Sequence, residues 1–184
     1  KELLSEIDPI KFISYQIMGN KSNSSDISLL WEYGPHAISL LLDIYKNDPT
    51  QIQGWAKPSK KECDEITLKL KFPDQTEPFV KLSWSSIKKR ELTLICKKGS
   101  LIYNDLQLNR LTLIKDVGAN IKKTYPAYNH QLPLDAELDE FIQAISKKQD
   151  IKRSNLDFGI KVTKILHLAE QSIKNKGEAV NVSF

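Results

Sequence analysis

The sequence has only two cysteines, and they are far apart. Cys63 and Cys96 lie in separate strand-like segments without Cys-x-x-Cys spacing, which is typical of reduced, partly buried thiols in a cytoplasmic protein. A disulfide between the two is the alternative. With three histidines and no paired cysteine motif, the sequence shows no recognisable structural metal site. We therefore predict a cytoplasmic location and no bound metal.

The sequence also lacks long apolar runs and closely spaced glycines. The longest apolar run lies near residues 40–42, whereas a membrane-spanning helix needs ~20 apolar residues, so we expect no membrane partner. No two of the seven glycines fall within a few residues of each other. A Gly-x-Gly-x-x-Gly loop, which holds a dinucleotide pyrophosphate at a helix N-terminus, therefore cannot be formed. This chain alone is expected to bind no nicotinamide cofactor.

The composition that remains is that of one folded domain. The 184 residues are 40% hydrophobic and 27% charged, which suffices for a single core, so residues 1–184 are predicted to form one domain. The net charge of +4 is spread over short basic doublets at the expected ends of strands and helices, where lysines protect strand edges. A nucleic-acid site would gather such charge on one face among aromatic residues. We expect no nucleic-acid partner.

Apolar spacing predicts a sheet followed by two helices. Residues 11–18 and the alternating stretch 51–113 predict strands, separated by breaks at 73–74, 85–86, 98–99 and 104–105. Connections this short indicate hairpins and an antiparallel meander. Helical spacing follows Pro133 and recurs before Gly177, and both helices should pack on the sheet. The predicted fold class is α+β, with a large, mainly antiparallel open sheet and helices packed on one face.

The other face of such a sheet would be uncovered. Its apolar members, including Phe79, Ile95 and Ile102, would form an exposed patch, which predicts a homo-oligomer through the sheet face.

Residues 117–131 show neither the strand nor the helix period, so we expect a mobile loop there. A polar, aromatic cluster in this segment comprises Tyr125, Tyr128, Asn129 and His130. Residues of these types are suited to stacking on a sugar and hydrogen-bonding it. An ordinary surface loop is the alternative.

An acid and an imidazole stand four residues apart beside a Gly-Pro pair. At this spacing Glu32 and His36 share one helical face, where the carboxylate can orient the ring for proton transfer. A chance pair on a surface helix is the alternative. Pro35 is predicted to open the main helix at its first turn, after a separate short turn with Leu29 and Leu30. His36 would then lie in the first turn, where the helix dipole favours the neutral ring.

The run Glu-Tyr-Gly-Pro-His-Ala-Ile-Ser at 32–39, with the apolar residues after it, resembles a known family signature. This signature is Asp-x-Gly-x-His-x-x-(Asp or Ser) before an apolar run, in the C-terminal domain of the Gfo/Idh/MocA oxidoreductases. Further segments resemble that domain in the same order, at 48–54, 80–85, 99–105, 132–142 and 169–172.

The resemblance implies the substrate-binding and oligomerisation domain of an NAD(P)-dependent oxidoreductase acting on a small sugar or sugar derivative. His36 would supply or relay the general base, and Glu32 would contact a substrate hydroxyl or steer the imidazole. NAD or NADP and a catalytic lysine would come from a Rossmann domain of the parent protein, and this chain alone would be inactive. Two departures, Glu32 for the usual Asp and a short loop at 20–26, favour the alternative of a non-catalytic scaffold or binding module of the same fold.

Overall fold

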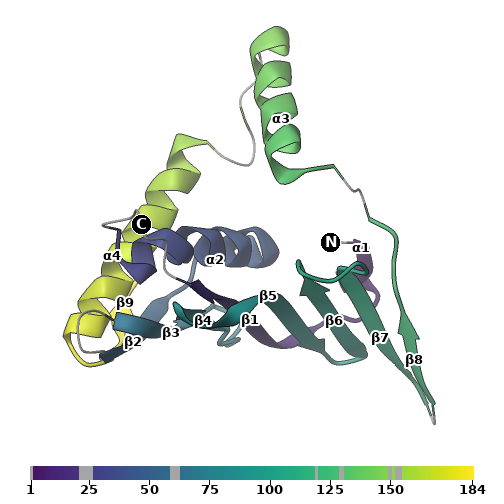
Figure 1. The fold of residues 1–184 in the computed structure, drawn as a ribbon, viewed down its shortest axis with the longest axis horizontal. Coiled ribbons are helices and arrows are strands. Elements are labelled where there is room, and N and C mark those ends of the chain that lie inside the picture. The colour runs from purple at the N-terminus through teal and green to yellow at the C-terminus, as the bar shows by residue number, and fades with distance from the viewer. Residues whose placement is uncertain are drawn as a thin grey trace.

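A computed structural model of the chain describes residues 2–20, 27–58, 63–118, 120–128, 131–148, 151 and 155–184. The described residues form one nine-stranded sheet and four helices (Figure 1). The strands are β1 (Ile10–Asn20), β2 (Gln51–Pro58), β3 (Cys63–Lys71), β4 (Phe79–Ser83), β5 (Ser85–Cys96), β6 (Gly99–Asn104), β7 (Leu111–Val117), β8 (Asn120–Thr124) and β9 (Val180–Asn181). The helices are α1 (Glu2–Ser5), α2 (Leu29–Tyr45), α3 (Pro133–Lys147) and α4 (Leu156–Lys174). The predicted α+β class with a mainly antiparallel open sheet is confirmed.

The first strand lies in the middle of the sheet. The strand order is β8-β7-β6-β5-β1-β4-β3-β2-β9, in which β1 pairs with β4 in parallel and with β5 antiparallel. The hairpin predicted at 85–86 is therefore wrong, because β4 and β5 lie on opposite sides of β1. Alternation shows that a segment is a strand, but it does not identify the strand's neighbours.

Helices α2 and α4 pack on the same face of the sheet (Figure 1). Both contribute buried residues to the hydrophobic core that the strands share. They also approach each other closely at Gly34, where a Cβ atom would lie 2.6 Å from Cδ2 of Leu166. Helix α4 is fastened to β2 by the buried Ser172, whose hydroxyl accepts from the Gly54 amide at 2.9 Å and donates to the Glu178 carbonyl at 2.6 Å. This packing holds α2 firmly over the central strands.

Helix α2 is longer at its N-terminus than the sequence suggests. It runs unbroken from Leu29, with Pro35 inside it, although proline has no N–H to donate to the carbonyl of Trp31. The predicted helix start at Pro35 is wrong, because the buried Leu29 and Leu30 hold the preceding turns against the core. His36 consequently lies beyond the first turn, and the effect of the helix dipole on its ring has largely decayed there.

Helix α3 does not pack on the sheet, contrary to the prediction, and it stands clear of the other elements (Figure 1). Its large apolar residues are between 49% and 64% exposed, namely Leu134, Leu138, Phe141, Ile142 and Ile145. Helical periodicity defines an apolar face, but it does not say what covers that face.

The segment predicted as a loop at 117–131 contains a strand. Residues of β8 pair antiparallel with β7, from Leu113 opposite Thr124 to Val117 opposite Asn120. The strand lies at the edge of the sheet, and most of its side chains are exposed on both faces, Ile121 at 78%. Without a buried face, an edge strand needs no apolar alternation, which explains why the pattern failed.

Candidate functional site

A cavity of about 310 Å³ lies between α2 and strands β1, β5 and β6. Helix α2 contributes Glu32, Tyr33 and His36, and the sheet side contributes Tyr15, Ile17, Arg90, Tyr103 and Asp105. The strand register explains why the sheet residues meet. Tyr15 lies opposite Leu92, which in turn lies opposite Tyr103, so both tyrosines point to the same face of the sheet from one cross-strand row.

His36 is an exposed side chain at the border of two cavities. The second is more open, about 680 Å³, and largely apolar, with Leu92, Leu101 and Phe158 in its walls. The Ser39 hydroxyl, also beside this second cavity, donates to the His36 backbone carbonyl at 3.2 Å. The imidazole can therefore meet both a ligand in the polar cavity and solvent.

Glu32 is held by a tryptophan. The indole Nε1–H of Trp84, a residue only 6% exposed, donates to Oε2 of Glu32 at 3.1 Å. The sequence places Glu32 and His36 on one helical face, and the structure does bring both to one cavity. The hydrogen bond that it shows for Glu32, however, goes to Trp84, which joins the end of β4 to β5. Trp84 thus fixes the position of a carboxylate in the cavity wall.

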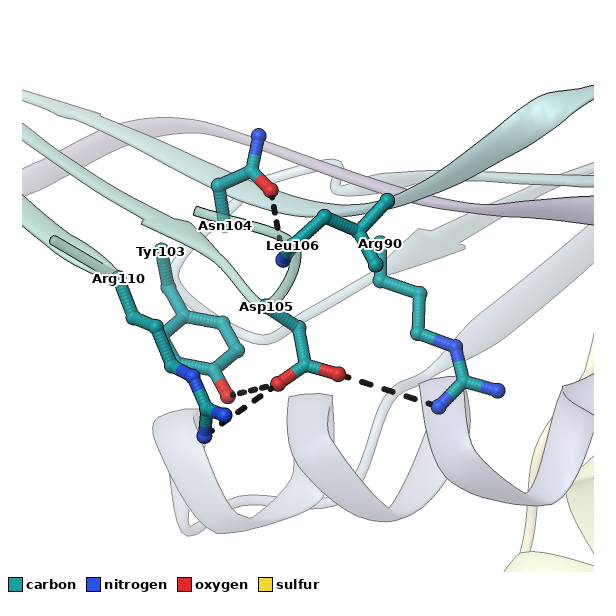
Figure 2. A network of polar contacts seen from close by, with 6 residues as sticks. All are labelled: Arg90, Tyr103, Asn104, Asp105, Leu106 and Arg110. Carbon is teal, nitrogen blue, oxygen red and sulfur yellow. Dashed lines mark hydrogen bonds and ion pairs between the residues drawn. The ribbon is translucent and has the colours of Figure 1, made fainter. Parts of the chain in front are cut away.

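A carboxylate between two arginines forms the opposite wall (Figure 2). Oδ1 of Asp105 accepts from the Tyr103 hydroxyl at 3.1 Å and lies 3.6 Å from Arg110, while Oδ2 lies 3.9 Å from Arg90. The turn that carries Asp105 is stabilised by the Leu106 amide, which donates to the Asn104 side chain at 3.0 Å. Sequence reasoning missed this network. The only signal was the Asn-Asp pair at the predicted strand break, which indicates a turn but not a site.

Three tyrosine hydroxyls in this cavity keep their protons to unusually high pH. Burial raises the pKa of Tyr15, with Asp105 adding to the shift and Arg90 opposing it. Burial and then the Glu32 charge raise the pKa of Tyr33, and burial together with the hydrogen bond to Asp105 raises that of Tyr103. All three hydroxyls therefore keep their protons, and that of Tyr103 is already donated to Oδ1 of Asp105.

The predicted tyrosine cluster is placed elsewhere. Tyr125 follows β8 at the sheet edge and is 53% exposed, with Nζ of Lys123 5.3 Å from its ring centroid. Neither Tyr125 nor Tyr128 lines the two described cavities at His36, and Asn129 and His130 lie outside the described residues. A role for these four residues in substrate binding stays a prediction.

In the described part of the chain, no three His, Cys, Asp or Glu side chains are grouped so that they could hold a metal ion. Cys96 is a free, buried thiol, and burial raises its pKa, which makes it a poor nucleophile. No described helix is both long and apolar enough to cross a bilayer.

No protein-family model and no curated protein matches the sequence, but solved structures match its fold. An aldose-aldose oxidoreductase from Caulobacter crescentus is 12% identical, with a TM-score of 0.79 over 96% of this chain and 56% of its own. UDP-N-acetylglucosamine 3-dehydrogenase from Acidithiobacillus ferrooxidans is 15% identical, with a TM-score of 0.74 over 90% and 54% of the two chains. An NAD binding oxidoreductase from Klebsiella pneumoniae is 13% identical, with a TM-score of 0.76 over 98% and 61%.

At such identities the likeness shows a shared fold. All three structures are oxidoreductases, and two are named for sugar substrates. This is the class of protein that the sequence motifs at 32–39 and after resemble. The chain spans between 54% and 61% of the length of these structures.

Proposed function

We propose that this chain is the substrate-binding domain of an NAD(P)-dependent oxidoreductase that acts on a sugar or sugar derivative. The observation that carries the proposal is the polar cavity itself. It combines His36, Glu32, Asp105 and three protonated tyrosines on a fold shared with sugar-acting oxidoreductases. Alternating donors and acceptors around one small cavity suit the hydroxyls of a sugar ring.

In the proposed reaction, His36 accepts the proton of the sugar hydroxyl that is oxidised. The exposed ring can then pass this proton to solvent, since it borders the open cavity as well as the polar one. Tyr15 donates a hydrogen bond to a neighbouring sugar oxygen. The Tyr103 oxygen and Oδ2 of Asp105 accept from sugar hydroxyls, because the Tyr103 proton is donated to Oδ1 of Asp105. Glu32, fixed by Trp84, accepts from another sugar hydroxyl and orients the imidazole ring of His36. A nicotinamide would accept the hydride.

The nicotinamide would be held by a part of the parent protein outside this chain. The scattered glycines of this chain do not fit a dinucleotide phosphate loop. The chain also covers only 54% to 56% of the length of two of the matched structures. The exposed apolar face of α3 is available to pack against such a domain, because no described part of the chain covers it. An apolar helix face of this length is costly to leave in water.

The outer face of the sheet supports self-association. Phe12 and Phe79 lie on it with ring centroids 6.1 Å apart, and Ile95 lies opposite Phe12 in the register. These three side chains are between 36% and 44% exposed. Of the residues named for the predicted patch, Phe79 and Ile95 are exposed and Ile102 is half-buried. We propose that this patch forms the contact between two copies of the chain.

The second candidate is a non-catalytic sugar-binding module. One oxygen of Glu32 is occupied by Trp84, and the side chain is one methylene longer than the aspartate of the signature that it resembles. Displacement of a carboxylate by about an ångström can cost ~100-fold in rate. A module of this kind would keep the cavity and lose the chemistry.

The test is a pair of histidine variants in the full-length parent protein. His36→Ala should lower kcat with NAD or NADP and a responsive sugar by roughly 100- to 10,000-fold, while cofactor affinity changes little. His167→Ala is the matched control, because His167 is also exposed on a helix, lies 3.1 Å from the Gln171 side chain and is not among the residues described as lining the two cavities at His36. A His36→Ala protein that keeps more than half of its kcat would remove His36 from the mechanism and leave the binding module as the better description.

A further inference from the structure

A third cavity, of about 560 Å³, adjoins the sugar cavity along β1 and β5. The two cavities share Tyr33 and Arg90. Other residues of the third cavity are Met18, Gly19, Asn20, Ile87 and Lys88. A Cβ atom at Gly19 would lie 3.3 Å from the Tyr33 hydroxyl. A side chain at position 19 would therefore crowd the hydroxyl of Tyr33, which lines both cavities.

The charge of this third cavity differs from that of the sugar cavity. Among the described residues that line it, Lys88 and Arg90 are cationic and none is acidic, whereas the sugar cavity contains Glu32 and Asp105. The cationic residues come from β5. Lys88 and Arg90 both line this cavity, while Lys89 between them on β5 is not among its described lining residues and pairs with Glu91 at 3.1 Å.

Arg90 can bind an anion in this cavity in addition to its contact with Asp105. Its contact with Asp105, at 3.9 Å, is longer than a hydrogen bond. A guanidinium carries five N–H donors in a planar fork, so a second anion can be bound beside the first.

We propose that the third cavity binds the phosphoryl group of a phosphorylated or nucleotide-linked sugar whose ring occupies the cavity at His36. Arg90, at the junction, supplies the fork that matches two phosphoryl oxygens, and Lys88 supplies a second charge. Two cations in a cavity that no described acidic residue lines suit a group of charge near −2 better than a single carboxylate, even though Arg90 also lies 3.9 Å from Asp105. The placement of the ring rests on the function proposed above, whereas the anion site depends only on Lys88, Arg90 and the cavity.

Binding to the 184-residue chain tests the site without any need for turnover. Phosphorus NMR titrations with α-D-glucose 1-phosphate and with inorganic pyrophosphate measure the dissociation constants directly. Lys88→Gln and Arg90→Gln should each weaken binding of both probes roughly 10-fold or more, the worth of a charge-assisted hydrogen bond. Lys88 is exposed, so its substitution should leave the fold intact.

Lys89→Gln is the matched control, because it removes the same charge from the same strand at a residue that is not among those described as lining the third cavity. It should change the dissociation constants less than twofold. Equal weakening by Lys88→Gln and Lys89→Gln would show diffuse attraction to a basic strand and would overturn the proposal. So would the absence of measurable binding of either probe at 10 mM, and so would tighter binding of D-glucuronate, measured by proton NMR, than of the phosphate ester.

The two proposals can fail separately. If Lys88→Gln weakens binding but the parent protein oxidises no sugar, the anion site stands and the dehydrogenase function falls. If the parent oxidises neutral sugars in a His36-dependent way while Lys88→Gln leaves phosphate binding unchanged, the anion site falls and the dehydrogenase function stands.

Discussion

Two helical glycines should respond in opposite ways to the same substitution. A Cβ atom at Gly34 in α2 would lie 2.6 Å from Cδ2 of Leu166 and 3.4 Å from Cδ1 of Leu30. Both leucines are at most 3% exposed, so neither can move out of the way freely. At Gly159 in α4, no heavy atom of the described chain lies within 4 Å of the added Cβ.

The magnitudes follow from two terms. Glycine to alanine inside a helix gains up to about 1 kcal/mol at either position, because alanine loses less backbone entropy. At Gly34 the overpacking against Leu166 costs roughly 1–3 kcal/mol, whereas at Gly159 it costs nothing. Gly34→Ala should therefore be less stable than Gly159→Ala by about 1–3 kcal/mol, or by roughly 2–12 °C in Tm for a domain of this size.

The assay is urea unfolding followed by tryptophan fluorescence, with the same chain length and buffer for both variants. A Gly34→Ala variant as stable as Gly159→Ala would refute the close approach of α2 and α4. The double variant Gly34→Ala with Leu166→Ala gives a second check. Because the clash is with Leu166, Gly34→Ala should cost less free energy in that background than in the native one.

Three further outcomes are expected. Because burial raises the pKa of Tyr15 in the folded state, the unfolded state loses this phenol proton first as pH rises. The free energy of unfolding should therefore fall above about pH 10, and fall less steeply in Tyr15→Phe. Urea titrations from about pH 9 to 11.5 measure this dependence, and equal slopes for the two proteins would contradict the prediction. Phe79→Glu should convert oligomers to monomers in light scattering at tens of micromolar, whereas Ile121→Glu, exposed at the far sheet edge, should not. Calorimetry should detect no micromolar binding of NAD(H) or NADP(H) to the isolated chain, and such binding would refute the proposal that another domain holds the cofactor.

Local patterns determined much of this fold. The alternation of β3, β4 and β5, the helical spacing in α3 and α4, and the breaks at 98–99 and 104–105 agree with the structure. They are readable because a half-buried strand or helix must repeat its apolar residues with its own period. The same rule placed Glu32 and His36 on one helical face, since a spacing of four is nearly one turn.

Only the tertiary structure decided which surfaces meet. It placed β1 between β4 and β5, and so brought Tyr15 beside Arg90, Tyr103 and Asp105 to form a cavity under His36. It also extended α2 back to Leu29, put Trp84 against Glu32, and left the apolar face of α3 without a partner among the described residues. These features depend on contacts between residues far apart in the chain, and the period of a single segment carries no information about the segment packed against it.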